Sequence, residues 1–270
     1  MLFKDPRHNE LSVAATVSVA MVVLIVVVTQ LSNASRARIA SEEAGQPIAV
    51  FPDFASVDSV DVKKQQFFDY LEDYIIAENI RISRDRAQLE PYVEIANSGA
   101  EFSDREREWI LELADYYRVE TEGLSDRAIA NELFLRVDEI PVSLALAQAA
   151  NESAWGTSRF ALQGNNIFGE WCFDEGCGIV PRRRASGASH EVQKFESIEE
   201  SIASYFLNIN THNSYQYLRE LRANMRNRGQ DLDPMVLAMG LGRYSQRGDN
   251  YVDEVQNIIL QNGLRNRDKS

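Results

Sequence analysis

The chain has 270 residues, and 44% of them are hydrophobic, so it is long enough and apolar enough to bury a large core. It carries 41 acidic and 28 basic side chains, a formal net charge of −13. This balance argues against a general nucleic-acid-binding protein, because such a protein presents a basic face. The acidic excess lies in the first half: residues 1–139 hold 26 acidic and 14 basic side chains, whereas residues 140–270 hold 15 and 14. We therefore expect the two halves to have different tasks.

The first distinct feature along the chain is an uncharged, valine-rich segment from Leu11 to Ser35. As a helix it would be about 37 Å long, more than the roughly 30 Å hydrocarbon core of a bilayer. We therefore expect a single transmembrane anchor over residues 11–31, after a cytoplasmic tail of residues 1–10. The alternative is a cleaved signal peptide, since small residues follow at 32–34, although the apolar run is longer than a usual signal core. The flanking basic residues are too evenly distributed to set the orientation.

A linker and an acidic helical region are predicted next. Residues 32–57 contain two prolines and no helical period, which is typical of a linker. Over residues 58–122 apolar side chains recur at helical spacing, and Ser103 with Glu106 forms a capping box before one such stretch. The sequence thus predicts amphipathic helices throughout this acidic region.

The remaining residues, 123–270, have a different pattern. One amphipathic helix follows Ser125, and another begins at Pro141 with an apolar stripe. The segments Gly178–Arg184 and His190–Phe195 are short candidate strands around a turn, which predicts a β-hairpin. Helical patterns then continue to the end, so the expected fold class is mainly α (α+β) with one small β element.

Glu152 is the one acidic residue between positions 140 and 169. It extends the apolar stripe of the helix that begins at Pro141, and it falls near that helix's C-terminus, where the helix dipole opposes negative charge. Both effects favour the protonated carboxyl, the form that donates a proton in glycosidic-bond cleavage. Trp155 and Phe168 are candidates for the apolar wall and for a sugar-binding face. The alternative is that the helix ends earlier and Glu152 turns into solvent, paired with Arg159.

The chain has two cysteines, Cys172 and Cys177, which enclose four residues. This spacing suits a small disulfide ring and an oxidising compartment outside the cytoplasmic membrane. Two free buried cysteines are an alternative. A zinc site is disfavoured because the chain has three histidines and no second cysteine pair, so we expect no metal.

The run AQAANESAWGTSRFALQGNNIFGEW resembles the catalytic-helix signature of family seventy-three of the glycoside hydrolases, a lysozyme-like group of bacterial N-acetylglucosaminidases, and in particular its membrane-associated Bax-type members. The resemblance covers roughly residues 123–262. It implies a lysozyme-like helical domain over residues 123–270 with a small β-hairpin. It also implies that Glu152 is the general acid and that Trp155, Asn166 and Phe168 shape the saccharide cleft.

A later stretch resembles the segment of that family that supplies a tyrosine to the reaction centre. Tyr244 matches that tyrosine, where a phenol can hydrogen-bond the substrate's N-acetyl group or a water. The spacing is one residue longer here, so the resemblance also admits Tyr251. The alternative is that both are ordinary half-buried helix residues.

The sequence departs from the family pattern at the second carboxylate, because no acid stands in the hairpin's first strand. The nearby alternatives are Glu170, Asp174, Glu175 and Glu191. A mechanism assisted by the substrate's own 2-acetamido group needs no second acid, and we favour that mechanism or an acid on a mobile hairpin.

Two arginines of the hairpin, Arg182 and Arg184, alternate along the predicted strand and would point the same way. Guanidinium groups bind carboxylates, which the stem peptides of peptidoglycan carry. The alternative is a solvated edge strand whose charge prevents aggregation.

The expected function is cleavage of the β-1,4 bond after N-acetylglucosamine in peptidoglycan, with no cofactor and no nucleic-acid partner. The expected location is the inner (cytoplasmic) membrane, with the catalytic part in the periplasm. Two alternatives stay open: a glycan-binding or scaffold protein without competent chemistry, and a lytic transglycosylase.

Overall fold

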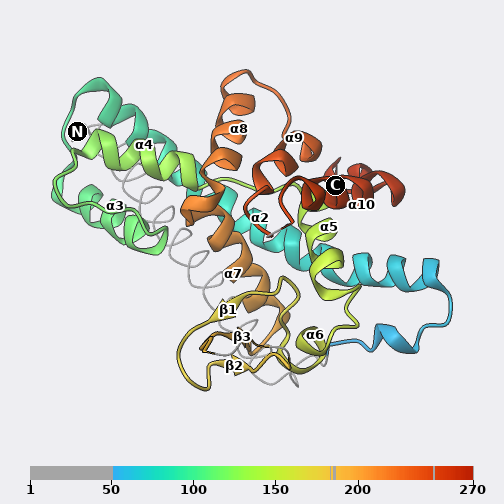
Figure 1. Cartoon of the computed structure of the whole chain (residues 1–270). Helices are drawn as coiled ribbons and strands as arrows, with labels where there is room; N and C mark the ends of the chain where they lie inside the picture. The colour runs from blue at the N-terminus through green and yellow to red at the C-terminus, as the bar shows by residue number, and fades with distance from the viewer. Residues whose placement is uncertain (1–50, 183, 185–186, 246, 270) are drawn as a thin grey trace, which may run out of the picture. The chain divides into compact units, whose positions relative to one another are not determined.

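The computed structural model describes residues 51–269 apart from 183, 185, 186 and 246, and Figure 1 shows the elements they form. The predicted tail, the predicted membrane segment and most of the predicted linker lie outside these residues. Among the residues described, no helix is both long and apolar enough to span a bilayer.

The described part is mainly helical with one small antiparallel sheet. The longer helices are α2 (Val60–Ser98), α3 (Asp104–Tyr116), α4 (Asp126–Arg136), α5 (Val142–Ser153), α7 (Ile198–Thr211), α8 (Gln216–Asn227) and α10 (Asp249–Gln261). Shorter turns of helix are η1 (Phe54–Ser56), α6 (Arg159–Gly164), η2 (Asn213–Tyr215), α9 (Pro234–Ala238), η3 (Met239–Leu241) and η4 (Leu264–Lys269). The strands are β1 (Trp171–Cys172), β2 (Gly178–Ile179) and β3 (Glu191–Gln193).

The predicted acidic helical region is built on α2, which runs through 39 residues (Figure 1). The side chain of Ser59 caps its first turn, and Gly99 ends it in the left-handed conformation at φ 83°. Its apolar stripe contacts α4, α5 and α7, and its buried residues belong to the same hydrophobic core as those of α5. The acidic region therefore shares one core with the C-terminal half.

The C-terminal end of the predicted linker is packed rather than extended. Phe51 and Phe54 are both buried, and their rings contact Tyr70 edge to face at centroid distances of 5.7 and 6.1 Å. Phe54 also contacts Phe67 of α2 at 5.5 Å. The predicted linker boundary at residue 57 is therefore too late, because two phenylalanines in a polar stretch gain enough apolar burial to fold onto α2.

A buried ionic cluster lies just before α5. Asp138 is 2% exposed and accepts a hydrogen bond from Arg226 at 2.8 Å, while Arg222 and Arg86 lie 3.7 and 3.6 Å away. Arg222 is fully buried and donates to the backbone carbonyls at positions 135, 136, 138 and 139 and to Asn210. Burial alone would raise the pKa of Asp138, but the three guanidinium groups outweigh it and hold that pKa below its usual range.

The sheet has the order β1-β3-β2 with both pairings antiparallel. Gly178 pairs with Gln193 and Ile179 with Val192, which confirms the predicted pairing of the two segments but over a shorter length. The first segment leaves the sheet after Ile179, and Pro181 lacks an N–H with which to extend the ladder. The carbonyl of Pro181 instead closes a turn with the N–H of Arg184 at 3.1 Å.

That early exit corrects the expectation for the two hairpin arginines. Arg182 and Arg184 lie beyond β2, so strand alternation does not set their directions. Arg184 donates to the carbonyls of Ser189 and His190, both at 3.3 Å, which closes the loop on itself.

The two cysteines form a disulfide that closes the turn between β1 and β2. Glu191 on β3 braces the same turn from inside, since its carboxylate accepts hydrogen bonds from the N–H groups of Gly176 and Gly178 at 3.3 and 2.9 Å. This turn is thus fixed both covalently and by charge-assisted hydrogen bonds.

Candidate functional site

The sequence after Glu152 ends α5 abruptly. Ser153 donates its hydroxyl to the carbonyl of Ala149 at 2.6 Å and accepts the N–H of Gly156 at 2.8 Å. Ala154, Trp155 and Gly156 then adopt left-handed conformations in succession, at φ 51°, 59° and 73°. The helix therefore stops one residue after Glu152 and leaves its carboxyl at the helix C-terminus, as predicted from the apolar stripe.

The carboxyl of Glu152 is largely shielded from solvent, with its side chain 21% exposed. Gly169, at φ 72°, faces it so closely that a Cβ there would lie 3.6 Å from Oε2, and Oε1 is buried without a hydrogen-bond partner. Burial raises the pKa of Glu152, more than the hydrogen bond from Tyr251 and the charge of Arg247 lower it. A partly enclosed carboxyl with a raised pKa retains its proton to higher pH than an exposed one.

A buried chain of hydrogen bonds leads to this carboxyl. Tyr205 on α7 donates its hydroxyl to Oε1 of Gln148 at 2.6 Å, and Nε2 of Gln148 donates to the hydroxyl oxygen of Tyr251 at 3.0 Å. The Tyr251 hydroxyl also acts on Glu152, whose pKa it lowers. Because Gln148 donates to the Tyr251 oxygen, the phenol proton is left free for another acceptor.

One cation approaches the same carboxyl. A guanidinium nitrogen of Arg247 lies 4.0 Å from Oε1 of Glu152, and the guanidinium also pairs with Glu254 and lies over the Tyr251 ring at 5.2 Å. Glu254 on α10 raises the pKa of Glu152, opposing Arg247. The expected partner Arg159 lies elsewhere, since it donates to the carbonyl of Val180 at 2.8 Å.

Asn166 and Phe168 build the turn that faces Glu152. The side chain of Asn166 is 1% exposed, donates to the carbonyls of Glu170 and Gln193, both at 2.9 Å, and accepts the N–H groups of Gly169 and Glu170. Phe168 is buried against the ring of Tyr205 at a centroid distance of 3.8 Å. These two residues therefore shape the site from behind, and their side chains are committed to internal contacts.

Tyr244 stacks parallel on Tyr251 at 5.3 Å and donates its hydroxyl to the carbonyl of Phe168 at 2.8 Å. Burial of the Tyr244 side chain is the main cause that raises its pKa, and the negative charge of Glu152 adds to this effect. The structure thus brings Tyr244 and Tyr251 together at Glu152. Of the two, Tyr251 interacts with the carboxyl directly, and Tyr244 fixes the turn that precedes Gly169.

Trp155 points toward α2 rather than toward an open cleft. Its ring contacts Phe68 and Phe67 edge to face at 5.3 and 6.1 Å, and the ammonium group of Lys64 lies 4.8 Å from its centroid. Its observed contacts therefore join the end of α5 to the acidic helical region.

The structure separates the four alternatives for a second acid. Glu191 is 7% exposed and occupied by the disulfide turn, whereas Asp174 and Glu175 are exposed within that turn. Glu170 directly follows Gly169, receives the Ser204 hydroxyl at 2.9 Å on Oε2, and has its other oxygen buried without a partner. Burial raises the pKa of Glu170 to about 7, against the smaller lowering effects of Ser204 and Arg118.

Arg182 lines a shallow cavity of about 580 Å³ with Arg159, between α6 and the loop after β2. The remaining lining residues are Thr157, Phe160, Leu162, Gln163 and Pro181. The cavity is close in sequence to the turn after Glu152, and one of its two arginines, Arg159, donates to the carbonyl of Val180. Arg184 does not line it.

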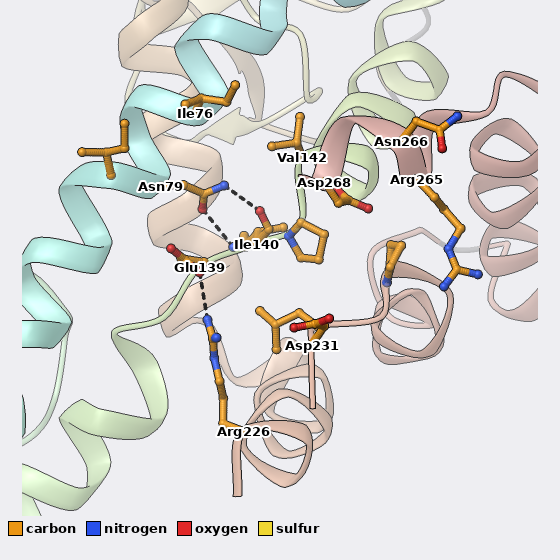
Figure 2. A pocket seen from close by; sticks show the side chains of 14 residues that line it. Ile76, Asn79, Glu139, Ile140, Val142, Arg226, Asp231, Arg265, Asn266 and Asp268 are labelled. Carbon is orange, nitrogen blue, oxygen red and sulfur yellow. Dashed lines mark hydrogen bonds and ion pairs between the residues drawn. The ribbon is translucent and has the colours of Figure 1, made fainter. Parts of the chain in front are cut away.

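A cavity of about 660 Å³ lies at the opposite end of α5 (Figure 2). Figure 2 shows Asn79 hydrogen-bonded to Ile140 and Arg226 to Glu139, with Asp231, Arg265 and Asp268 also among the residues that line the cavity. Val142 lines this cavity and stands ten positions before Glu152, about 15 Å along the helix. It is therefore distinct from the candidate active site.

Across the described residues, no group of three or more His, Cys, Asp or Glu side chains is placed to hold a metal ion. The chemistry that the site offers comes from the shielded carboxyl of Glu152, the Tyr251 hydroxyl that lowers its pKa and the adjacent Arg247–Glu254 pair.

Sequence reasoning missed Gln148, Tyr205 and Arg247. Gln148 had a signal, because it is a polar residue in an apolar stretch and stands four positions before Glu152, hence on the same helix face. Tyr205 and Arg247 had none, since they reach the site from α7 and from the loop before α10.

Comparisons with known proteins point to one family. The model of the family described as glucosaminidase, mannosyl-glycoprotein endo-beta-N-acetylglucosaminidase, matches residues 128–264. Protein bax of Escherichia coli strain K12 is 32% identical over 200 residues, which cover 74% of this chain and 70% of that protein. Among solved structures, the catalytic domain of the autolysin Auto from Listeria monocytogenes aligns at 15% identity and a TM-score of 0.41, covering 79% of this chain and 92% of that one.

Proposed function

This chain belongs to the glucosaminidase family of glycoside hydrolases, and from that premise we propose that it cleaves the β-1,4 bond after N-acetylglucosamine in peptidoglycan, with Glu152 as general acid. The observation that carries the proposal is the carboxyl of Glu152 at the C-terminal end of α5, which has a raised pKa and one oxygen without a hydrogen-bond partner. The family whose model matches residues 128–264 is one of endo-beta-N-acetylglucosaminidases, which supports cleavage after N-acetylglucosamine.

In the proposed reaction, Glu152 donates its proton to the glycosidic oxygen as the bond from the sugar's C1 to that oxygen breaks. The departing sugar leaves with a new hydroxyl, and Glu152 is left as a carboxylate. The Tyr251 hydroxyl then donates to that carboxylate, and Gln148 and Tyr205 hold the phenol in the required orientation. A hydrogen bond to the charged form stabilises the carboxylate that Glu152 becomes, and so offsets the free-energy cost of ionising a shielded group.

The electron-deficient C1 needs a nucleophile. Assistance by the substrate's 2-acetamido oxygen, followed by water, requires no second acid. Glu170 is the one of the four candidate acids that is shielded and adjacent to the turn facing Glu152. Measuring the anomer released first distinguishes the routes, because acetamido assistance retains the configuration and direct attack by water inverts it.

We place the enzyme at the inner membrane, anchored by residues 11–31 with the catalytic part in the periplasm. The support is the uncharged length of that segment and the Cys172–Cys177 disulfide, which suits an oxidising compartment. Fusing a periplasm-dependent reporter after residue 270, and comparing it with a fusion after residue 10, tests this orientation.

The test of the reaction is the nearly isosteric substitution Glu152→Gln. We expect release of new reducing ends from purified peptidoglycan to fall at least about 100-fold, in the range that general acids contribute, with thermal stability preserved. The matched control is Glu175→Gln, which changes an exposed carboxyl of the disulfide turn and should keep parental activity.

Two outcomes would contradict the proposal. If the parent protein binds peptidoglycan but releases no sugar between pH 4 and 8, the chain is a glycan-binding or scaffold protein. If mass spectrometry finds anhydro-muramic ends instead of reducing N-acetylglucosamine ends, the chain is a lytic transglycosylase.

A further inference from the structure

An exposed aromatic platform stands beside the candidate active site. Trp171 is 54% exposed, and its ring is stacked on the imidazole of His190 at a centroid distance of 4.1 Å and an interplanar angle of 14°. A tryptophan side chain is rarely so exposed unless it binds a ligand or another protein. Most exposed apolar side chains, moreover, are not held flat against a second ring. Because His190 covers one face, the exposed area lies mainly on the opposite face.

The platform is rigid. Trp171 lies in β1 and pairs with Val192 of β3, and the next residue, Cys172, is held by the disulfide to Cys177. His190 immediately precedes β3, so both rings project from neighbouring strands. Groups held on a braced sheet lose little conformational entropy when they bind a ligand.

The platform is also continuous with the reaction centre. Trp171 is separated from Gly169, the residue that faces Oε2 of Glu152, by Glu170 alone. Two consecutive Cα–Cα steps of about 3.8 Å bring the Trp171 backbone within roughly 8 Å of that of Gly169. The distance is short enough for one polysaccharide strand to contact both the carboxyl and the ring.

Resting on the proposed function, we infer that the Trp171–His190 stack is a saccharide subsite that binds a pyranose ring of the N-acetylated glycan strand next to the sugar being cleaved. The C–H groups on one side of a pyranose carry partial positive charge, and the face of an indole is negative, so the two surfaces attract while water is displaced from both. Phe173, two residues along in the adjacent turn, is a further exposed aromatic side chain, with 70% of its surface accessible. The hydroxyl and acetamido groups stay in solvent, which suits a repeating polymer.

Binding is measured first, in a variant that should not cleave the glycan. In the full-length Glu152→Gln protein, tetra-N-acetyl-chitotetraose should change the tryptophan emission, because Trp171 is far more exposed than the partly buried Trp109 and Trp155. We expect Trp171→Phe to abolish that emission change but keep most of the affinity, since a ring remains. Trp171→Ala should weaken sedimentation with insoluble peptidoglycan about tenfold.

The matched control is Tyr116→Ala, which removes an exposed aromatic ring from α3 and should bind like the parent. In the active protein, Trp171→Ala should raise KM about tenfold with kcat within about twofold, as expected for a contact made equally in ground and transition states. If Trp171→Ala binds peptidoglycan as tightly as the parent, the subsite is refuted.

The two proposals fail separately. Binding through Trp171 by a parent protein that hydrolyses nothing supports the subsite and refutes the reaction. Hydrolysis with an unchanged KM in Trp171→Ala supports the reaction and refutes the subsite. Failure of the parent to bind either probe refutes both.

Discussion

Two shielded carboxylates flank α5, and their surroundings are opposite. Asp138, four residues before the helix, meets three guanidinium groups that hold its pKa low. Glu152, one residue before the helix ends, has one partly exposed arginine at 4.0 Å and a pKa raised by burial. Asp138 is therefore held in its charged form by the cations it joins, and Glu152 keeps its proton to higher pH than an exposed carboxyl.

The difference shows that the charged cluster that stabilises the fold and the carboxyl of the candidate active site lie at opposite ends of α5. The Asp138 cluster joins α2, α8 and the segment before α5, and its charges are compensated. At the other end, the unpartnered oxygen of Glu152 represents a cost to stability, as buried polar atoms without partners do. Substitutions at the first site should change stability, and substitutions at the second should change activity.

The largest effect is expected for Asp138→Asn. Removing this charge leaves Arg222 buried without its carboxylate, which should destabilise the protein by about 3–5 kcal/mol in urea unfolding. Activity per folded molecule should be unchanged. Glu132→Gln, which breaks the more exposed pair with Arg136, should cost less than about 1 kcal/mol. Similar costs for both substitutions would refute the structural role of the cluster.

Tyr251→Phe should affect the other end of the helix. It removes the hydroxyl that lowers the pKa of Glu152, so the carboxylate formed in the proposed reaction is less stabilised, and kcat should fall about 10- to 100-fold. Tyr205→Phe removes the far end of the same chain and should reduce kcat less. Steady-state kinetics on peptidoglycan decides this, and an equal loss in both variants would argue that the chain acts only through packing.

Glu170→Gln tests a third shielded carboxyl. Its pKa of about 7 in the folded state exceeds its ordinary value. Between the ordinary pKa and pH 7 the native protein therefore binds more protons than the unfolded one. The free energy of unfolding falls as the pH rises through this range. The contribution is at most about 1.4 kcal/mol per pH unit. The substitution should flatten this slope in urea unfolding measured from pH 4.5 to 8. An unchanged slope would show that Glu170 is ionised when folded.

The smallest effect is expected for substitutions of Arg247 and Glu254, whose charges shift the pKa of Glu152 in opposite directions. A general acid must be protonated, so activity falls as pH rises through its pKa. Arg247→Ala removes a cation, raises the pKa of Glu152 and should move the alkaline limb of the pH–activity profile to higher pH. Glu254→Gln should move it to lower pH. Both shifts should be under about one pH unit because the pair is partly exposed, and shifts in the same direction would contradict the assignment.

Much of the fold followed from local patterns. The helix that carries Glu152, the capping box at Ser103 and the pairing of the two hairpin segments were all predicted from spacing. The limits of the strands were not, because Pro181 ends the pairing and β1 joins from a segment with no alternating pattern. Phe51 and Phe54 were assigned to a linker, since their burial depends on a partner helix that begins several residues later.

The amino-acid sequence by itself singled out the candidate acid, because the apolar stripe of the helix that begins at Pro141 extends to Glu152, the one acidic residue between positions 140 and 169. Only the tertiary structure decided its neighbours. Tyr205, Tyr251 and Arg247 come from three other segments, and the direction of each hydrogen bond depends on how those segments pack around α5. Local spacing sets which face of a helix a residue occupies, whereas the pKa and reactivity of a carboxyl depend on groups distant in sequence but within a few ångströms in space.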